Sequence, residues 1–114
     1  EPPQRWLLHP SVVVAMTIYE LKDERDRTFA FEVAVPLGGR RRVSSIVRRI
    51  QGVKITKAPR FLSWFREETF CEFELGQVKF QAQEPFGDNS RYWIGPEDAA
   101  WHPEIDTVIR AFTG

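Results

Sequence analysis

A two-residue loop between two alternating runs constrains this chain more than any other feature. Residues 69–75 and 78–84 alternate apolar and polar side chains, and only the dipeptide Gly76-Gln77 separates them. So short a loop joins antiparallel strands, and glycine in its first position is typical of a type II′ turn. Tight closure predicts the register: Leu75 pairs with Val78, Phe73 with Phe80, and Cys71 with Ala82 on a buried face, while Glu74 faces Lys79 on the other.

Four further segments have strand patterns. Residues 12–21 are a β-branched run without alternation, which indicates a strand covered on both faces. Residues 28–35 alternate, with Phe29, Phe31, Val33 and Val35 on one face, and the charged stretch 22–27 between these two runs predicts a hairpin. Short strands are predicted at 53–56 and 91–94, the latter ended by Gly95 and Pro96. Residues 61–65 fit either a helical turn or a strand.

Two segments have the helical period instead. In residues 41–51 the apolar positions fall at i, i+3, i+4 and i+7, and Gly52 suits the left-handed position just past the end. A last helix is predicted from Pro103 onward with one apolar stripe of Ile105, Val108, Ile109 and Phe112. The fold class is therefore α+β: an antiparallel sheet of about six strands in the order ββ-α-β-βββ-α, packed by the C-terminal helix. Such a sheet could also curl into a partly open barrel.

The length and composition favour a single globular domain. The 114 residues fit one domain, 1–114, in which the proline-rich residues 1–10 form an extended arm. The longest apolar run, 12–16, is far too short to cross a membrane, and no signal peptide is visible. The single cysteine provides no disulfide framework. Cytoplasm is therefore the default expectation, although a removed segment before Glu1 is left open because the chain does not begin with Met.

A net charge of zero hides a strong asymmetry. Residues 40–66 contain nine basic residues and no acidic one, whereas residues 67–114 contain ten acidic and three basic residues. On the predicted helix Arg41, Ser45 and Arg48 share the outer face, with Arg42 and Arg49 at its border. Such blocks either pair with each other or present two faces of opposite sign, and both arrangements are left open.

Catalytic patterns are nearly absent. His9 and His102 each precede a proline and are expected to be structural, and Cys71 falls on the buried face of the predicted hairpin. The acidic residues of the last third read as a solvated face; they include Asp88, Glu97, Asp98, Glu104 and Asp106. Since no His or Cys residues have metal-ligand spacing, we predict no metal and no cofactor. We expect a non-catalytic domain.

Two remaining groups of residues, the basic helix face and residues 87–93, indicate binding of a partner. A polar turn at 87–90 precedes Arg91-Tyr92-Trp93, three residue types enriched in binding hot spots. The leading hypothesis is a protein-interaction domain that binds through Arg41, Arg42, Arg48, Arg49, Arg91, Tyr92 and Trp93. An alternative is a module that binds the phosphates of nucleic acid or of anionic lipid head groups through the basic stretch 40–60. A third hypothesis is a small hydrolase that uses the acidic last third. The identity of the partner and the oligomeric state cannot be read from the residues.

Overall fold

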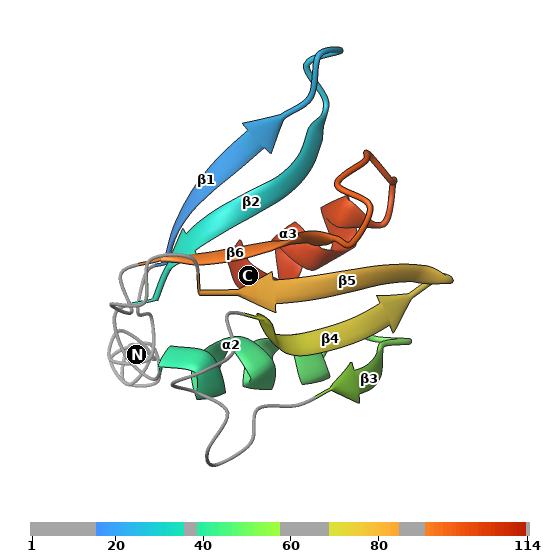
Figure 1. The fold of residues 1–114 in the computed structure, drawn as a ribbon. Helices are drawn as coiled ribbons and strands as arrows, with labels where there is room; N and C mark the ends of the chain where they lie inside the picture. The colour runs from blue at the N-terminus through green and yellow to red at the C-terminus, as the bar shows by residue number, and fades with distance from the viewer. Residues whose placement is uncertain (1–15, 36–38, 58–68, 85–90, 114) are drawn as a thin grey trace, which may run out of the picture.

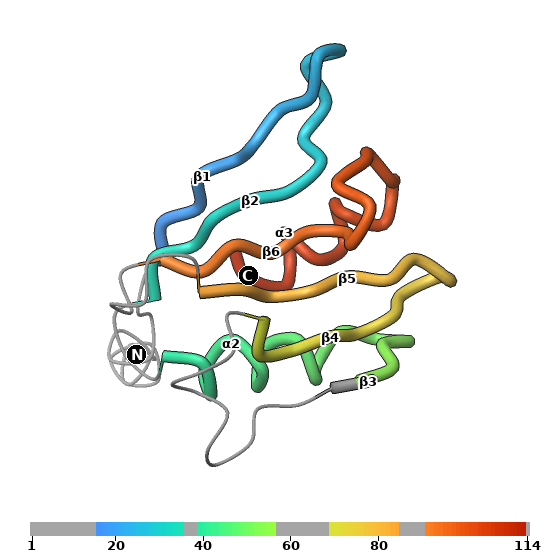
Figure 2. Tube along the Cα trace, viewed as in Figure 1, coloured from blue at the N-terminus to red at the C-terminus, as the bar shows by residue number. Residues whose placement is uncertain are grey.

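The computed structural model describes residues 16–35, 39–57, 69–84 and 91–113. The elements follow the chain as β1 (Thr17–Lys22), β2 (Thr28–Ala34), α2 (Gly39–Arg48), β3 (Lys54–Lys57), β4 (Thr69–Leu75), β5 (Val78–Gln83), β6 (Tyr92–Pro96) and α3 (Ile105–Thr113). The six strands form one antiparallel sheet in the order β1-β2-β6-β5-β4-β3, which the tube in Figure 2 shows from top to bottom. This confirms the α+β class and the predicted element order.

The sheet is open. β1 and β3 are its two edges, so the strands of the described part do not close into a barrel. Figure 1 shows the β1–β2 hairpin leaving the body of the molecule, and both helices lying on the same side of the sheet. None of the helices in the described residues is long and apolar enough to cross a membrane.

The β4–β5 hairpin has the predicted register. Leu75 pairs with Val78, Phe73 with Phe80 and Cys71 with Ala82, and the two phenyl rings stack with centroids 5.3 Å apart and planes 8° apart. The predicted turn type was wrong. Gly76 and Gln77 have φ of 58° and 70°, and positive φ at both central positions is the signature of type I′ rather than type II′. The twist of a type I′ turn matches that of the strands, so Gln77 is held in a conformation that side chains disfavour.

The helices cover the apolar side of the sheet and share one core with it. The predicted stripe of α2 is buried, with Val43 and Val47 fully so, and α3 buries Ile105, Val108 and Phe112. Edge-to-face contacts connect the layers: Phe31 of β2 meets Phe112 at 5.4 Å. The sheet therefore has one helix-covered face and one that no described element covers.

Helix α2 begins and ends earlier than predicted. It starts at Gly39 and stops at Arg48 rather than at Gln51. Residues 49–53 continue as tight turns, in which Arg49 N donates to Ile46 O and Ile50 N to Val47 O. Gly52 has φ of 85°, which confirms the predicted left-handed position.

Two details of the strands also differ from the predictions. β1 is an edge strand whose Tyr19 and Glu20 are exposed, so its described part is not covered on both faces. β6 continues through Gly95 and ends at Pro96, which pairs with Phe80, so the strand is two residues longer than predicted at this end. The predictions for the arm 1–10, for residues 12–15 and 61–65 and for the loop 85–90 lie outside the described residues.

Candidate functional site

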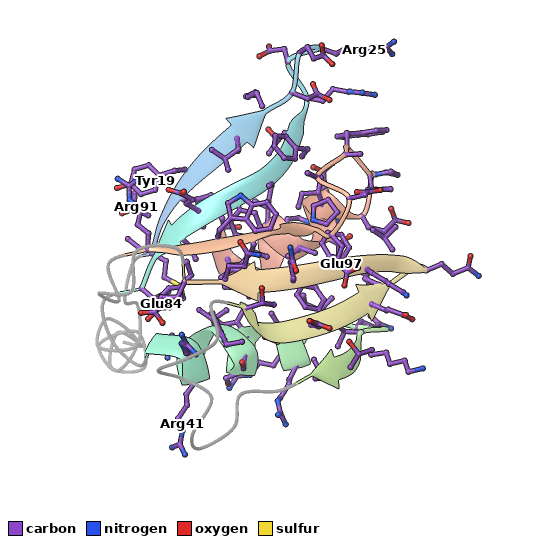
Figure 3. All side chains as sticks on the ribbon, in the orientation of Figure 1. Tyr19, Arg25, Arg41, Glu84, Arg91 and Glu97 are labelled. Atoms are coloured by element: carbon purple, nitrogen blue, oxygen red, sulfur yellow. The ribbon has the colours of Figure 1, made fainter. Side chains whose placement is uncertain are left out.

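The outer face of α2 carries the basic residues that the sequence singled out. Burial of Val43 and Val47 fixes the rotation of the helix, and Arg41, Arg42 and Arg48 consequently lie on exposed positions. Arg49, in the turn that follows, is exposed as well. We call Arg41, Arg42, Arg48 and Arg49 the α2 basic face. Figure 3 shows Arg41 pointing away from the body of the protein.

The basic middle and the acidic last third do pair, but through a different arginine. Arg40 Nε lies 2.6 Å from Glu84 Oε1, and both side chains are largely buried. The Arg40 guanidinium also lies over the Phe70 ring, 4.9 Å from its centroid. This contact joins the start of α2 to the end of β5, so Arg40 has a structural role. Arg40 was a candidate only as part of the basic stretch 40–60, and its pairing with Glu84 was not predicted because the two residues are 44 positions apart.

The α2 basic face itself has no acidic partner within the described residues. The ion pairs among the described residues involve other side chains: they join Lys22 to Glu20, Arg27 to Asp23, Arg40 to Glu84, Arg91 to Glu32 and His102 to Asp98. The first turn of α2 contains no acidic residue either. Because the positive end of the helix dipole lies there, Arg41 and Arg42 add charge where the helix alone would favour an anion. These two arginines therefore make the start of the helix less stable, and they make it a better site for an anionic ligand.

A shallow depression of about 260 Å³ lies on this face, lined by Arg41, Ser44, Ser45 and Arg48. These residues follow the spacing i, i+3, i+4 and i+7 and therefore lie on one side of the helix. Guanidinium groups donate hydrogen bonds in a fork that matches carboxylate and phosphate oxygens. The depression can accept either anion.

The second predicted region is organised differently. Tyr92 is fully buried, so of Arg91, Tyr92 and Trp93 only the first and last reach the surface. Arg91 Nη1 lies 3.1 Å from Glu32 Oε1, and its guanidinium stacks 3.8 Å from the Tyr19 ring centroid. Figure 3 shows Tyr19 and Arg91 together at one end of the sheet. The sequence did not identify Tyr19 or Glu32, since their position beside Arg91 depends on the pairing of β2 with β6.

Cys71 is a structural thiol. Its side chain is fully buried, and burial raises the pKa of the thiol, while the neighbouring Ser44 hydroxyl and the charge of Arg48 act in the opposite direction. A raised pKa withholds the thiolate that a nucleophile needs. The position confirms the predicted burial.

In the described part of the acidic third, His102 lies beside Asp98. His102 Nε2 lies 2.9 Å and 3.1 Å from the two Asp98 oxygens. The pKa of Asp98 is lowered, chiefly by the hydrogen bond from the Ala100 backbone N–H and further by His102. Asp106 is exposed, and throughout the described residues no group of three possible metal ligands comes together. His9 and Asp88 lie outside the described residues.

Comparison with protein-family models, with curated proteins and with solved structures found no match for this chain. No relative therefore carries a function across to it, and the surface of the protein is the basis on which a function can be inferred.

Proposed function

We propose that this protein is a non-catalytic interaction domain that binds an acidic segment of another protein through the α2 basic face. One observation carries the proposal: four exposed arginines gather on one helix and its C-terminal turn without an acidic partner among the described residues, whereas the adjacent Arg40 is paired with Glu84. Unneutralised charge of one sign attracts a partner of the other sign and speeds association.

The spacing of the arginines defines the partner further. Arg48 is seven positions after Arg41, and at a rise of about 1.5 Å per residue their Cα atoms are about 10 Å apart along the helix axis. A segment in the polyproline II conformation covers that distance in about three residues, and its three residues per turn place positions i and i+3 on the same side. We therefore expect Asp or Glu at positions i and i+3 of the partner. An exposed ion pair contributes at most about 1 kcal/mol, so several pairs must act together.

The runner-up is a module for phosphate groups of nucleic acid or lipid that uses the stretch 40–60. The depression lined by Arg41, Ser44, Ser45 and Arg48 favours it, because the exposed Ser45 hydroxyl and the guanidiniums both donate to phosphate oxygens. The acidic-segment proposal ranks higher because the chain as a whole has no net positive charge. A hydrolase acting through the acidic third ranks below both.

The test is capture of partners from native lysate by wild-type and charge-reversed protein, followed by mass spectrometry. The variant is Arg41→Glu with Arg48→Glu, and the matched control is Arg25→Glu with Arg110→Glu, two exposed arginines on other elements. Both double variants change the net charge equally. We expect the α2 variant to lose the captured protein and the control to retain it. Undiminished capture by the α2 variant would refute the proposal and leave the Arg91–Trp93 region as the binding surface.

A second measurement separates carboxylates from phosphates. Fluorescence anisotropy of a labelled peptide with Glu at i and i+3 is compared with that of labelled duplex DNA, and vesicles containing phosphatidylserine are tested by co-sedimentation. Binding to DNA weakens steeply with salt, because each neutralised phosphate releases a counterion. Tighter binding of DNA or of vesicles than of the peptide at physiological salt would establish the runner-up instead.

A further inference from the structure

The face of the sheet opposite the helices carries an aromatic and amide cluster. Tyr19, Glu32, Trp93 and Gln83 are consecutive register partners across β1, β2, β6 and β5. Their chain neighbours Val33, Tyr92 and Ala82 are fully buried on the helix side. Because side chains alternate along a strand, these four residues point away from the helices. They form a line across the face that no described element covers.

Trp93 lies against this face. A Cβ atom at Gly95 would come within 2.8 Å of Trp93 Cη2 and 3.0 Å of Cζ2, so the six-membered part of the indole lies over the Gly95 backbone. The same Cβ would lie 2.6 Å from Ala30 Cβ, which shows how closely the neighbouring strand approaches. The small residues Gly95 and Ala30 therefore leave room for the indole, which is half-buried on this face.

Amide side chains surround the ring. Gln81 pairs with Gly95 and Gln83 pairs with Trp93, so both outward-facing amides border the indole. Gln83 Nε2 donates to Thr69 Oγ1, which orients the amide. The Gln81 amide makes no hydrogen bond within the described part of the chain. An amide both donates and accepts, which suits ligands rich in hydroxyl groups.

The charges of this face are balanced. Glu74 pairs in register with Lys54 and with Lys79, and Glu32 is held by Arg91. A sheet that stacks nucleobases on its aromatic residues also needs a basic groove for the phosphates. Such a groove is absent from the described residues of this face, since the α2 basic face lies on the opposite side of the sheet. The chemistry favours a neutral ligand with one apolar face and a polar rim.

We propose that the outer face of the sheet binds a neutral saccharide. One face of a pyranose ring carries C–H groups and stacks on the Trp93 indole, while the hydroxyls at its edge exchange hydrogen bonds with Gln81 and Gln83. Aromatic rings provide such flat apolar contacts at a low cost in conformational entropy. This site is separate from the α2 basic face and does not depend on the function proposed for it.

The experiment is an NMR titration of the ¹⁵N-labelled protein with neutral oligosaccharides of glucose, mannose, galactose, xylose and N-acetylglucosamine, each up to about 10 mM. We expect at least one of them to shift the Trp93 indole N–H and the Gln81 and Gln83 side-chain amides, while the α2 signals stay in place. The affinity should be nearly independent of salt, because no counterions are released. Absence of shifts with the whole panel, or shifts confined to other regions, would overturn the proposal.

Variants provide the matched comparison. Trp93→Ala should weaken saccharide binding at least about tenfold, and Gln81→Ala about two- to tenfold, the range expected for one hydrogen bond. The controls are Trp101→Ala and Gln77→Ala, which remove an exposed indole and an exposed amide elsewhere. Equal losses in the controls would contradict the site.

If Trp93→Ala does not fold, the shift map of the unaltered protein decides the question. A proline-rich peptide that displaced the saccharide from Trp93 at lower concentration would also contradict it, since the site would then be one for a peptide.

Discussion

Truncating Phe73 to alanine tests the hairpin on which the whole fold depends. The side chain is fully buried and stacks on Phe80, with the ring centroids 5.3 Å apart. Phe→Ala in a core costs about 3–5 kcal/mol through lost burial and the remaining cavity. The aromatic pair contributes about 0.5–1.5 kcal/mol of its own. We therefore expect a loss near the upper end, about 4–5 kcal/mol, which is a large share of the 5–15 kcal/mol typical of a domain.

Urea denaturation followed by circular dichroism measures this loss. With a slope of about 1–3 kcal/mol per molar urea, the midpoint should fall by more than about 1 M. The control is Glu74→Ala on the same strand, which removes a half-buried side chain from the opposite face and should cost no more than about 1 kcal/mol. A loss below about 1.5 kcal/mol for Phe73→Ala, or a larger loss for Glu74→Ala, would mean that the buried face has been assigned wrongly.

Three further predictions concern single sites. Cys71 should resist thiol reagents in the folded protein and react only in denaturant, because burial raises its pKa; rapid labelling at neutral pH without denaturant would contradict this. Gln77→Gly should raise the free energy of unfolding by about 1 kcal/mol in urea titrations, since φ at this position is positive; a lowered midpoint would argue against the type I′ turn. NMR titration should show the pKa of Asp98 below the ordinary value of about 3.9, and His102→Ala should raise it only partly because the Ala100 N–H remains. Since the folded pKa is the lower one, the stabilisation by Asp98 is present at neutral pH and is lost as the pH falls through that pKa; an unshifted pKa in the intact protein would contradict the pairing.

Local patterns predicted most of the fold. The register of β4 and β5 followed from two alternating runs and a two-residue loop, and the buried stripe of α2 followed from its period. Each of these two patterns is formed by residues that are close to one another in the sequence. The turn type was predicted wrongly because glycine in the first position fits type I′ as well as type II′, and the two types differ in the φ of the second position, Gln77. The exposure of β1 was predicted wrongly because an edge position depends on the order of the strands in space, which no local pattern contains.

The candidate site could be predicted only in part. The period of α2 placed Arg41 and Arg48 outward, and the structure has them there. The pattern at 91–94 alternates but does not say which face is buried, so Tyr92 remained a candidate although it belongs to the core. The Arg40–Glu84 contact and the stacking of Arg91 on Tyr19 are long-range, and neither could be derived from sequence spacing. The pairing of the basic residues 40–66 with the acidic residues 67–114 also depends on long-range contacts. Within the described residues, the two stretches pair through Arg40 and Glu84.

The arginine side chains themselves report most directly whether the α2 basic face binds an acidic segment. In an NMR titration with a peptide that carries Glu at i and i+3, the Nε–Hε signals of Arg41 and Arg48 should shift together and saturate. The signals of Arg40 and Arg91, which are held by Glu84 and Glu32, should stay nearly in place. Shifts at Arg91 without shifts at Arg41 and Arg48, or no shift at any of these arginines, would contradict the account.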